Sequence, residues 1–113
     1  CEEEEEPNDD LLTAQVLKTP PTCVEAYIAS DDQDYYTFSL ENPSHVVIET
    51  SGGDGDSYIC LYDEFGNELD CDDDSGEGLW SKIEIDLDRG NYYVMVEAYQ
   101  QGAEFDYTLS ITQ

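Results

Sequence analysis

Oxygen-bearing side chains gather in two parts of the chain in a pattern that suits a hard metal ion. They are Glu2–Glu6, Asn8, Asp9 and Asp10 near the start, then Asp31, Asp32 and Asp34. Carboxylate, amide and backbone oxygens are the ligands that Ca²⁺ prefers, with about six to eight of them around the ion. Because crowded carboxylates repel one another unless a divalent cation offsets their charge, the two groups predict a calcium site. The alternative is an acidic terminus that is only solvated.

A further acidic group has the spacing of a calcium-binding loop without its other requirements. Asp70, Asp72 and Asp74 follow a D-x-D-x-D pattern. In an EF-hand loop the sixth position is glycine and the twelfth is glutamate, but here these positions hold Ser75 and Ser81. The pattern therefore favours an exposed acidic hairpin tip over a metal site.

The four cysteines predict two disulfides and an oxidising compartment. Residues 64–67 are typical of a four-residue hairpin turn, and counting back from it along both strands places Cys60 opposite Cys71. Directly opposed residues of an antiparallel pair are close enough for a disulfide, and Cys1–Cys23 then follows by elimination. The alternative makes Cys1 the acylated first residue of a lipoprotein, which would leave Cys23 unpaired.

No constellation of residues indicates catalysis, so we expect a protein that is not an enzyme. His45 is the only histidine, and it has no nucleophile motif nearby, which favours a structural or surface role. No C-x-x-C spacing supports zinc. Most tyrosines are expected to pack inside the fold, with Tyr99 in a loop as the best exposed contact. The tyrosines expected in the core are Tyr36, Tyr58, Tyr92, Tyr93 and Tyr107.

Short segments rich in β-branched and aromatic residues must position these groups. They cover residues 24–29, 35–40, 45–50, 58–62, 83–87, 92–98 and 105–112, separated by Gly, Pro, Asn and Asp. Their alternation and spacing predict one all-β domain, an antiparallel β-sandwich or jelly roll of about eight strands. We expect the sandwich to span residues 23–113 and the acidic N-terminal segment, residues 1–22, to pack on it, with one or two helical turns in residues 10–17.

The net charge restricts the partners of the protein. With 29 Asp and Glu against 3 Lys and Arg, the 113 residues carry a formal charge of -26. A polyanion gains no counterion release from nucleic acid or an anionic membrane, so cations and basic partners are left. No apolar run approaches the roughly 20 residues that span a bilayer. We expect an extracellular or cell-surface location, after removal of a signal peptide.

Four pieces of the sequence, in order along the chain, resemble the bacterial pre-peptidase C-terminal (PPC) domain, a group that includes the collagen-binding domains of clostridial collagenases. These pieces are residues 6–9, 31–38, 61–66 and 87–96. The resemblance implies a secreted, non-catalytic β-sandwich. It also implies calcium between the acidic N-terminal segment and the start of the second strand, with a backbone carbonyl near Ala26 or Tyr27. The implied ligands are Glu4, Glu6, Asn8, Asp9, Asp31 and Asp34, with Asp32 as an alternative to Asp31.

Two functions follow as expectations. The first is a calcium-stabilised extracellular module that mediates adhesion or substrate binding to a protein or polysaccharide surface for an exported or surface protein. The second is a structural subunit that assembles with copies of itself into an extracellular filament or surface layer through its N-terminal segment. The first expects the acidic segment to fold onto its own domain, and the second expects it to lie against a neighbouring subunit.

Overall fold

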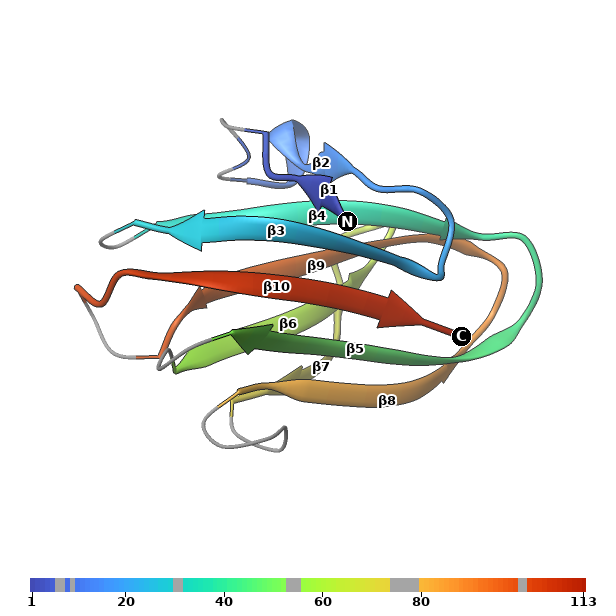
Figure 1. The fold of residues 1–113 in the computed structure, drawn as a ribbon. Helices are drawn as coiled ribbons and strands as arrows, with labels where there is room; N and C mark the ends of the chain where they lie inside the picture. The colour runs from blue at the N-terminus through green and yellow to red at the C-terminus, as the bar shows by residue number, and fades with distance from the viewer. Residues whose placement is uncertain (6–7, 9, 30–31, 53–55, 74–79, 100–101) are drawn as a thin grey trace.

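Two five-stranded sheets pack face to face in the computed structural model, which describes residues 1–5, 8, 10–29, 32–52, 56–73, 80–99 and 102–113 (Figure 1). Sheet A contains, in spatial order, β1 (Glu2–Glu3), β3 (Thr22–Ile28), β10 (Phe105–Thr112), β5 (Ser44–Gly52) and β8 (Lys82–Leu87). Sheet B contains β2 (Gln15–Val16), β4 (Gln33–Leu40), β9 (Gly90–Ala98), β6 (Ser57–Asp63) and β7 (Glu68–Asp72). The predicted all-β sandwich is confirmed, with ten strands rather than about eight.

Alternation along the strands separates the core from the two outer faces. On β4, Tyr36, Phe38 and Leu40 are buried, while the residues between them are more exposed. Tyr107, Leu109 and Ile111 do the same on β10, so the inner faces of both sheets supply one apolar core. Each large side chain buried in this way contributes about 1.5–3 kcal/mol to folding.

The two strands that the sequence analysis missed lie in the first 22 residues and run parallel to their partners. Glu2 pairs with Val24 across β1 and β3, and Gln15 pairs with Tyr36 across β2 and β4. Both sheets are therefore mixed, whereas the sequence predicted antiparallel pairing alone. The physical reason is that β3 and β4 would otherwise leave unpaired backbone groups at a sheet edge, and short strands from the N-terminal segment satisfy them.

The predicted helical turns in residues 10–17 are reduced to a single 3-10 turn, η1 (Leu11–Thr13). The Asp10 side chain accepts a hydrogen bond from the Thr13 backbone N–H and caps this turn. The chain then enters β2. The side chain of Gln15 donates to the Glu3 carbonyl and accepts from the Glu5 N–H, so it connects the N-terminal part of sheet A to sheet B.

The structure joins the cysteines in the predicted pairs. Cys1 is bonded to Cys23 and Cys60 to Cys71, with Cα separations of 4.8 and 4.1 Å. A sulfur in a disulfide cannot also carry a thioether-linked lipid, so this pairing supports the first of the two expectations for Cys1. A four-residue turn at residues 64–67 predicts that Asp63 faces Glu68, and this register was wrong by one residue. Tyr62 faces Glu68 instead, and an irregularity between Leu61 and Tyr62 restores the alignment before the cysteines are reached.

We expect the Cys1–Cys23 bond to stabilise the domain through the loop that it closes. Its sequence separation is 22 residues. Chain entropy gives such a crosslink about 3 kcal/mol of unfolding free energy, so the variant C1S/C23S should lose that amount in urea unfolding in calcium-free buffer. The single variant C1S removes the same crosslink and should show the same loss. A double variant that unfolds at the wild-type urea concentration would contradict this expectation.

Candidate functional site

Three of the predicted ligands, Glu4, Asn8 and Asp34, meet where the N-terminal segment crosses from sheet A to sheet B. The Glu4 backbone N–H donates to the Glu25 carbonyl at 3.0 Å. Its carboxylate accepts from the Tyr27 N–H at 3.1 Å through Oε1 and from the Asn8 amide at 3.2 Å through Oε2. These bonds hold the Glu4 side chain beside the end of β3.

Asn8 and Asp34 are both completely buried, which is unusual for polar side chains. The Asn8 carbonyl accepts a 2.7 Å hydrogen bond from the Tyr35 N–H, which places Asn8 next to the start of β4. Asp34 is the first inward-facing residue of that strand. The Asn8 backbone therefore fixes the N-terminal segment at the same end of sheet B as the Asp34 carboxylate.

Hydrogen-bonded tyrosine hydroxyl groups connect the Asp34 carboxyl group to the core. Asp34 Oδ2 accepts a 2.7 Å hydrogen bond from the Tyr107 hydroxyl, and the hydroxyls of Tyr107 and Tyr36 lie 2.6 Å apart. Because Tyr107 gives its only hydroxyl proton to Asp34, the Tyr36 hydroxyl must donate to Tyr107. Tyr107 belongs to sheet A and Asp34 to sheet B, so this polar chain connects the two sheets.

The electrostatics of the site favour a cation. Burial raises the pKa of Asp34 well above its usual range, and the neighbouring Glu4 carboxyl raises it further, while the hydrogen bond from Tyr107 lowers it. The second carboxylate oxygen, Asp34 Oδ1, is buried and has no hydrogen-bond partner among the described residues. An ionised carboxylate left in that state is costly, and a divalent cation would remove the cost.

The donor set fits calcium. Glu4, Asn8 and Asp34 offer carboxylate and amide oxygens, which are hard ligands, and Asp34 Oδ1 has no hydrogen-bond partner among the described residues that would compete with an ion. The other predicted ligands, Glu6, Asp9 and Asp31, lie outside the described residues. The alternative ligand Asp32 accepts a 3.0 Å hydrogen bond from the Gln33 N–H through Oδ1.

The second acidic group has structural roles where it is described. Asp72 Oδ2 accepts a 2.8 Å hydrogen bond from the Lys82 N–H and so connects β7 to β8. Asp70 Oδ1 accepts from the Cys71 N–H at 2.9 Å. Asp74 and Ser75 lie outside the described residues. Ligand-type atoms of Cys60, Glu68 and Cys71 lie within 4.8 Å of one another, but both sulfurs are in the disulfide and cannot ligate as thiolates.

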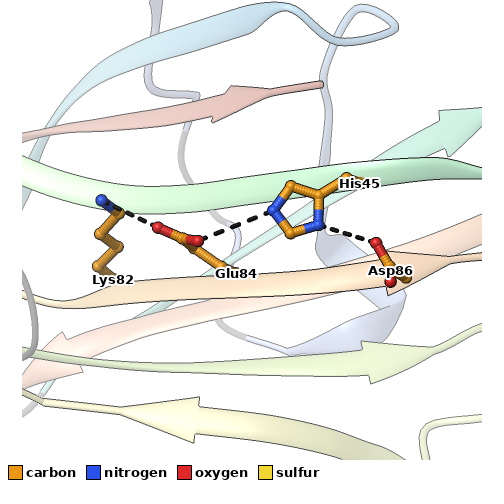
Figure 2. A network of polar contacts seen from close by, with 4 residues as sticks. All are labelled: His45, Lys82, Glu84 and Asp86. Atoms are coloured by element: carbon orange, nitrogen blue, oxygen red, sulfur yellow. Dashed lines mark hydrogen bonds and ion pairs between the residues drawn. The ribbon is translucent and has the colours of Figure 1, made fainter.

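His45 lies on the outer face of sheet A in a surface network of ion pairs (Figure 2). Its Nδ1 is 2.8 Å from Asp86 Oδ1, and its Nε2 is 3.8 Å from Glu84 Oε2. Lys82 Nζ lies 3.1 Å from the other Glu84 oxygen, and this contact lowers the pKa of Glu84. All four side chains are well exposed, so water and salt screen these pairs, and the surface role expected for His45 fits the structure.

Only some of the tyrosines that were expected in the core lie there. Tyr36, Tyr92 and Tyr107 are in the core as predicted, and Tyr99 is 57% exposed. Tyr58 and Tyr93 were expected inside, but both occupy outward positions on sheet B. The sequence contains the signal that was missed: adjacent strand residues point to opposite faces, so Tyr92 and Tyr93 cannot both be in the core.

Solved structures that share this fold include two from bacteria. The pre-peptidase C-terminal domain of a Bacillus anthracis collagenase has a TM-score of 0.73 at 21% identity, over 88% of this chain and 94% of that one. The Aeromonas hydrophila protein PliG, a periplasmic inhibitor of g-type lysozyme, has a TM-score of 0.60 at 9% identity, over 88% of this chain and 97% of that one. A search of curated proteins gives no match.

A match to a sequence-family model gives more direct evidence of the family than these structural similarities do. The model of the bacterial pre-peptidase C-terminal domain matches residues 32–98, which is more than half of the 113 residues. The matched part contains Asp34 and the strands from β4 to β9, while Glu4, Asn8 and β10 lie outside it. No helix among the described residues is long and apolar enough to cross a membrane. The chain belongs to the bacterial pre-peptidase C-terminal domain family.

Proposed function

We propose that this domain is a non-catalytic, calcium-stabilised extracellular module that mediates adhesion or substrate binding for an exported or surface protein. Its family is one of non-catalytic modules with a β-sandwich fold. Two disulfides suit an oxidising compartment outside the cytoplasm. The proposal therefore assigns the domain a binding task, with the metal serving the fold.

The observation that carries the calcium proposal is the buried Asp34 Oδ1, which has no hydrogen-bond partner among the described residues. Glu4, Asn8 and Asp34 would hold the ion, and Glu6, Asp9 and Asp31 complete the proposed ligand set. Calcium would supply the positive charge that two adjacent carboxylates, Glu4 and Asp34, otherwise lack. Since Glu4 and Asn8 belong to the N-terminal segment and Asp34 to β4, the bound ion would fasten that segment to sheet B.

Binding of this kind stabilises the folded state by mass action, because the unfolded chain does not assemble the ligands. Calcium at about 100 times its dissociation constant adds roughly 2.7 kcal/mol. For a domain of about 100 residues, that amount raises the Tm by about 10 °C or more. A thermal melt in excess EDTA and in millimolar calcium therefore measures the proposed effect directly.

The effect of Asp34→Asn on the melting temperature, relative to the wild type, should change sign between EDTA and calcium. In EDTA the variant should melt at or above the wild-type temperature, because the wild type must bury a carboxyl group beside Glu4 that either stays charged or takes up a proton on folding, and an amide needs neither. In millimolar calcium it should melt below the wild type, since a ligand charge is lost, and its calcium-induced shift should fall to about a third or less of the wild-type shift.

The matched control is Asp88→Asn, which removes the same charge from an exposed position in the turn between β8 and β9. This variant should keep the full calcium shift. The calcium proposal is wrong if the wild type melts at one temperature in both buffers, or if Asp34→Asn retains the wild-type shift.

Self-assembly into a filament is the second candidate, and the position of the N-terminal segment argues against it. Glu2 and Glu3 pair with β3 of the same chain, and the Cys1–Cys23 bond fixes them there. The segment is thus already paired within its own chain, and it would have to leave β3 before it could pair with a neighbouring subunit.

Light scattering distinguishes the two functions. We expect the mass of one chain, 12.7 kDa before any modification, both in millimolar calcium and in EDTA. Large particles that disperse in EDTA would instead identify a structural subunit with cations at its joints. Large particles that survive EDTA would point to strand exchange or intermolecular disulfides.

A further inference from the structure

Four tyrosines lie on the outer face of sheet B, the face that points away from the core. They are Tyr35 on β4, Tyr93 on β9, and Tyr58 and Tyr62 on β6, and each alternates with buried inward-facing residues. All four are half-buried. We call this set the tyrosine face.

The tyrosine face covers an apolar layer separate from the core of the sandwich. Cys60 and Met95 are only 2% and 4% exposed, yet neither belongs to the core cluster, because both point outward. The strand register places them side by side in the middle of the sheet, with Tyr35 next to Met95. Tyr62 faces Tyr93 in the adjacent row. The tyrosines are the large side chains placed to cover Met95 and the Cys60–Cys71 bond.

Tyr35 and Tyr62 lie on the two strands that flank β9. Burial raises the pKa of Tyr62, and the nearby Tyr35 hydroxyl raises it further although a whole strand separates the two residues. Tyr58 contributes in the same direction. The strand register therefore places the four tyrosines at outward positions of the three neighbouring strands β4, β9 and β6.

Carboxylates surround the tyrosine face. Glu97 lies opposite Tyr58 in the register and accepts a 2.9 Å hydrogen bond from the Gln33 side chain. Glu68 lies opposite Tyr62. The pKa of Tyr35 is raised by burial, then by Glu97 and Asp10. The pKa of Tyr58 is raised by burial, then by Glu68, Glu97 and Asp73. The three basic residues of the chain all lie outside the strands of sheet B: Lys18, Lys82 and Arg89.

Two strongly exposed apolar side chains flank one end of the tyrosine face. Leu12 of η1 is 96% exposed and Phe65 of the β6–β7 turn is 81% exposed. Their segments meet there, because a Cβ atom placed on Gly66 would lie 3.4 Å from Leu11 Cδ1. Aromatic and aliphatic groups beside an acidic rim are typical anchors of a protein interface.

We propose that the tyrosine face binds a basic polypeptide segment, with arginine or lysine side chains over the tyrosine rings and in contact with Glu68 and Glu97. This inference rests on the proposed binding function and gives it a surface and a partner. The π face of a tyrosine ring attracts cations, and a planar guanidinium can stack on a ring while it donates hydrogen bonds to a carboxylate. The net charge of -26 favours a cationic partner over a neutral polysaccharide and speeds its approach.

Fluorescence anisotropy with a labelled arginine–glycine repeat peptide tests the proposal, and the same peptide with citrulline in place of arginine is the uncharged control. Measurements are made at physiological salt in millimolar calcium. The arginine peptide should bind wild type more tightly than the citrulline peptide. Replacing two rings in Y58L/Y62L should weaken arginine-peptide binding about 5- to 30-fold. Leucine keeps apolar cover over the layer beneath, and a thermal melt verifies folding.

Tyr27→Leu is the matched control for the rings. Tyr27 is an exposed tyrosine on sheet A with Glu104 and Asp106 nearby, and it lines an acidic hollow of about 540 Å³. This variant should change the dissociation constant by less than about twofold, because one exposed ring outside the site contributes nothing to the proposed contact. A larger loss in Tyr27→Leu than in Y58L/Y62L would move the binding site to that hollow and overturn the proposal.

A charge comparison remains informative even if the tyrosine variant fails to fold. E68Q/E97Q removes two charges at the tyrosine face, and E25Q/E49Q removes two from the outer face of sheet A. Only the first pair should weaken binding clearly. Equal losses, or equal binding of both peptides, would mean attraction to bulk charge and would overturn the proposal. A protein that binds neither peptide but keeps its calcium shift would refute the tyrosine face and leave the calcium module standing.

Discussion

Burying a carboxylate costs free energy unless hydrogen bonds and opposite charge replace its water, and Asp34 is buried with a second carboxylate, Glu4, beside it. Much of the domain is arranged around this carboxylate. The Tyr107 hydroxyl reaches it from sheet A, and Asn8 and Glu4 approach it from the N-terminal segment. One carboxyl group thus joins the two sheets and lies beside the first residues of the chain, and its burial is the basis of the calcium proposal.

The same excess of negative charge acts in two different ways in this fold. Near Asp34 the carboxylates are crowded and poorly solvated, so they favour a small ion with a high charge. On the strands the carboxylates are mostly outward-facing and hydrated, where they set the electrostatic field that a partner meets. Glu97 illustrates the second role, since it lies beside an aromatic surface and is held by Gln33. The depth of an acidic residue below the surface therefore decides how strongly water and salt screen its charge.

Periodicity and turn chemistry were enough to predict the sandwich, the inward faces of β4 and β10, and the cysteine pairs. They did not reveal β1 and β2, because strands of two residues have no detectable alternation and form only where a neighbouring sheet edge needs partners. The acidic residues of the proposed calcium site were chosen from their composition and from family resemblance, and their role as ligands stays a prediction. The Tyr36–Tyr107 hydrogen bond was not, since it joins residues 71 positions apart that only the packing of two sheets brings together.

The disulfide at Cys1 also changes what happens when the N-terminal segment detaches. With Cys1 held to Cys23 at the start of β3, residues 2–22 form a closed loop and not a free tail. Glu4 therefore remains only a few bonds from a fixed anchor, at a high effective concentration near Asp34 even in the open state. A segment that is tethered in this way returns to its place by an intramolecular step, whose rate is independent of protein concentration.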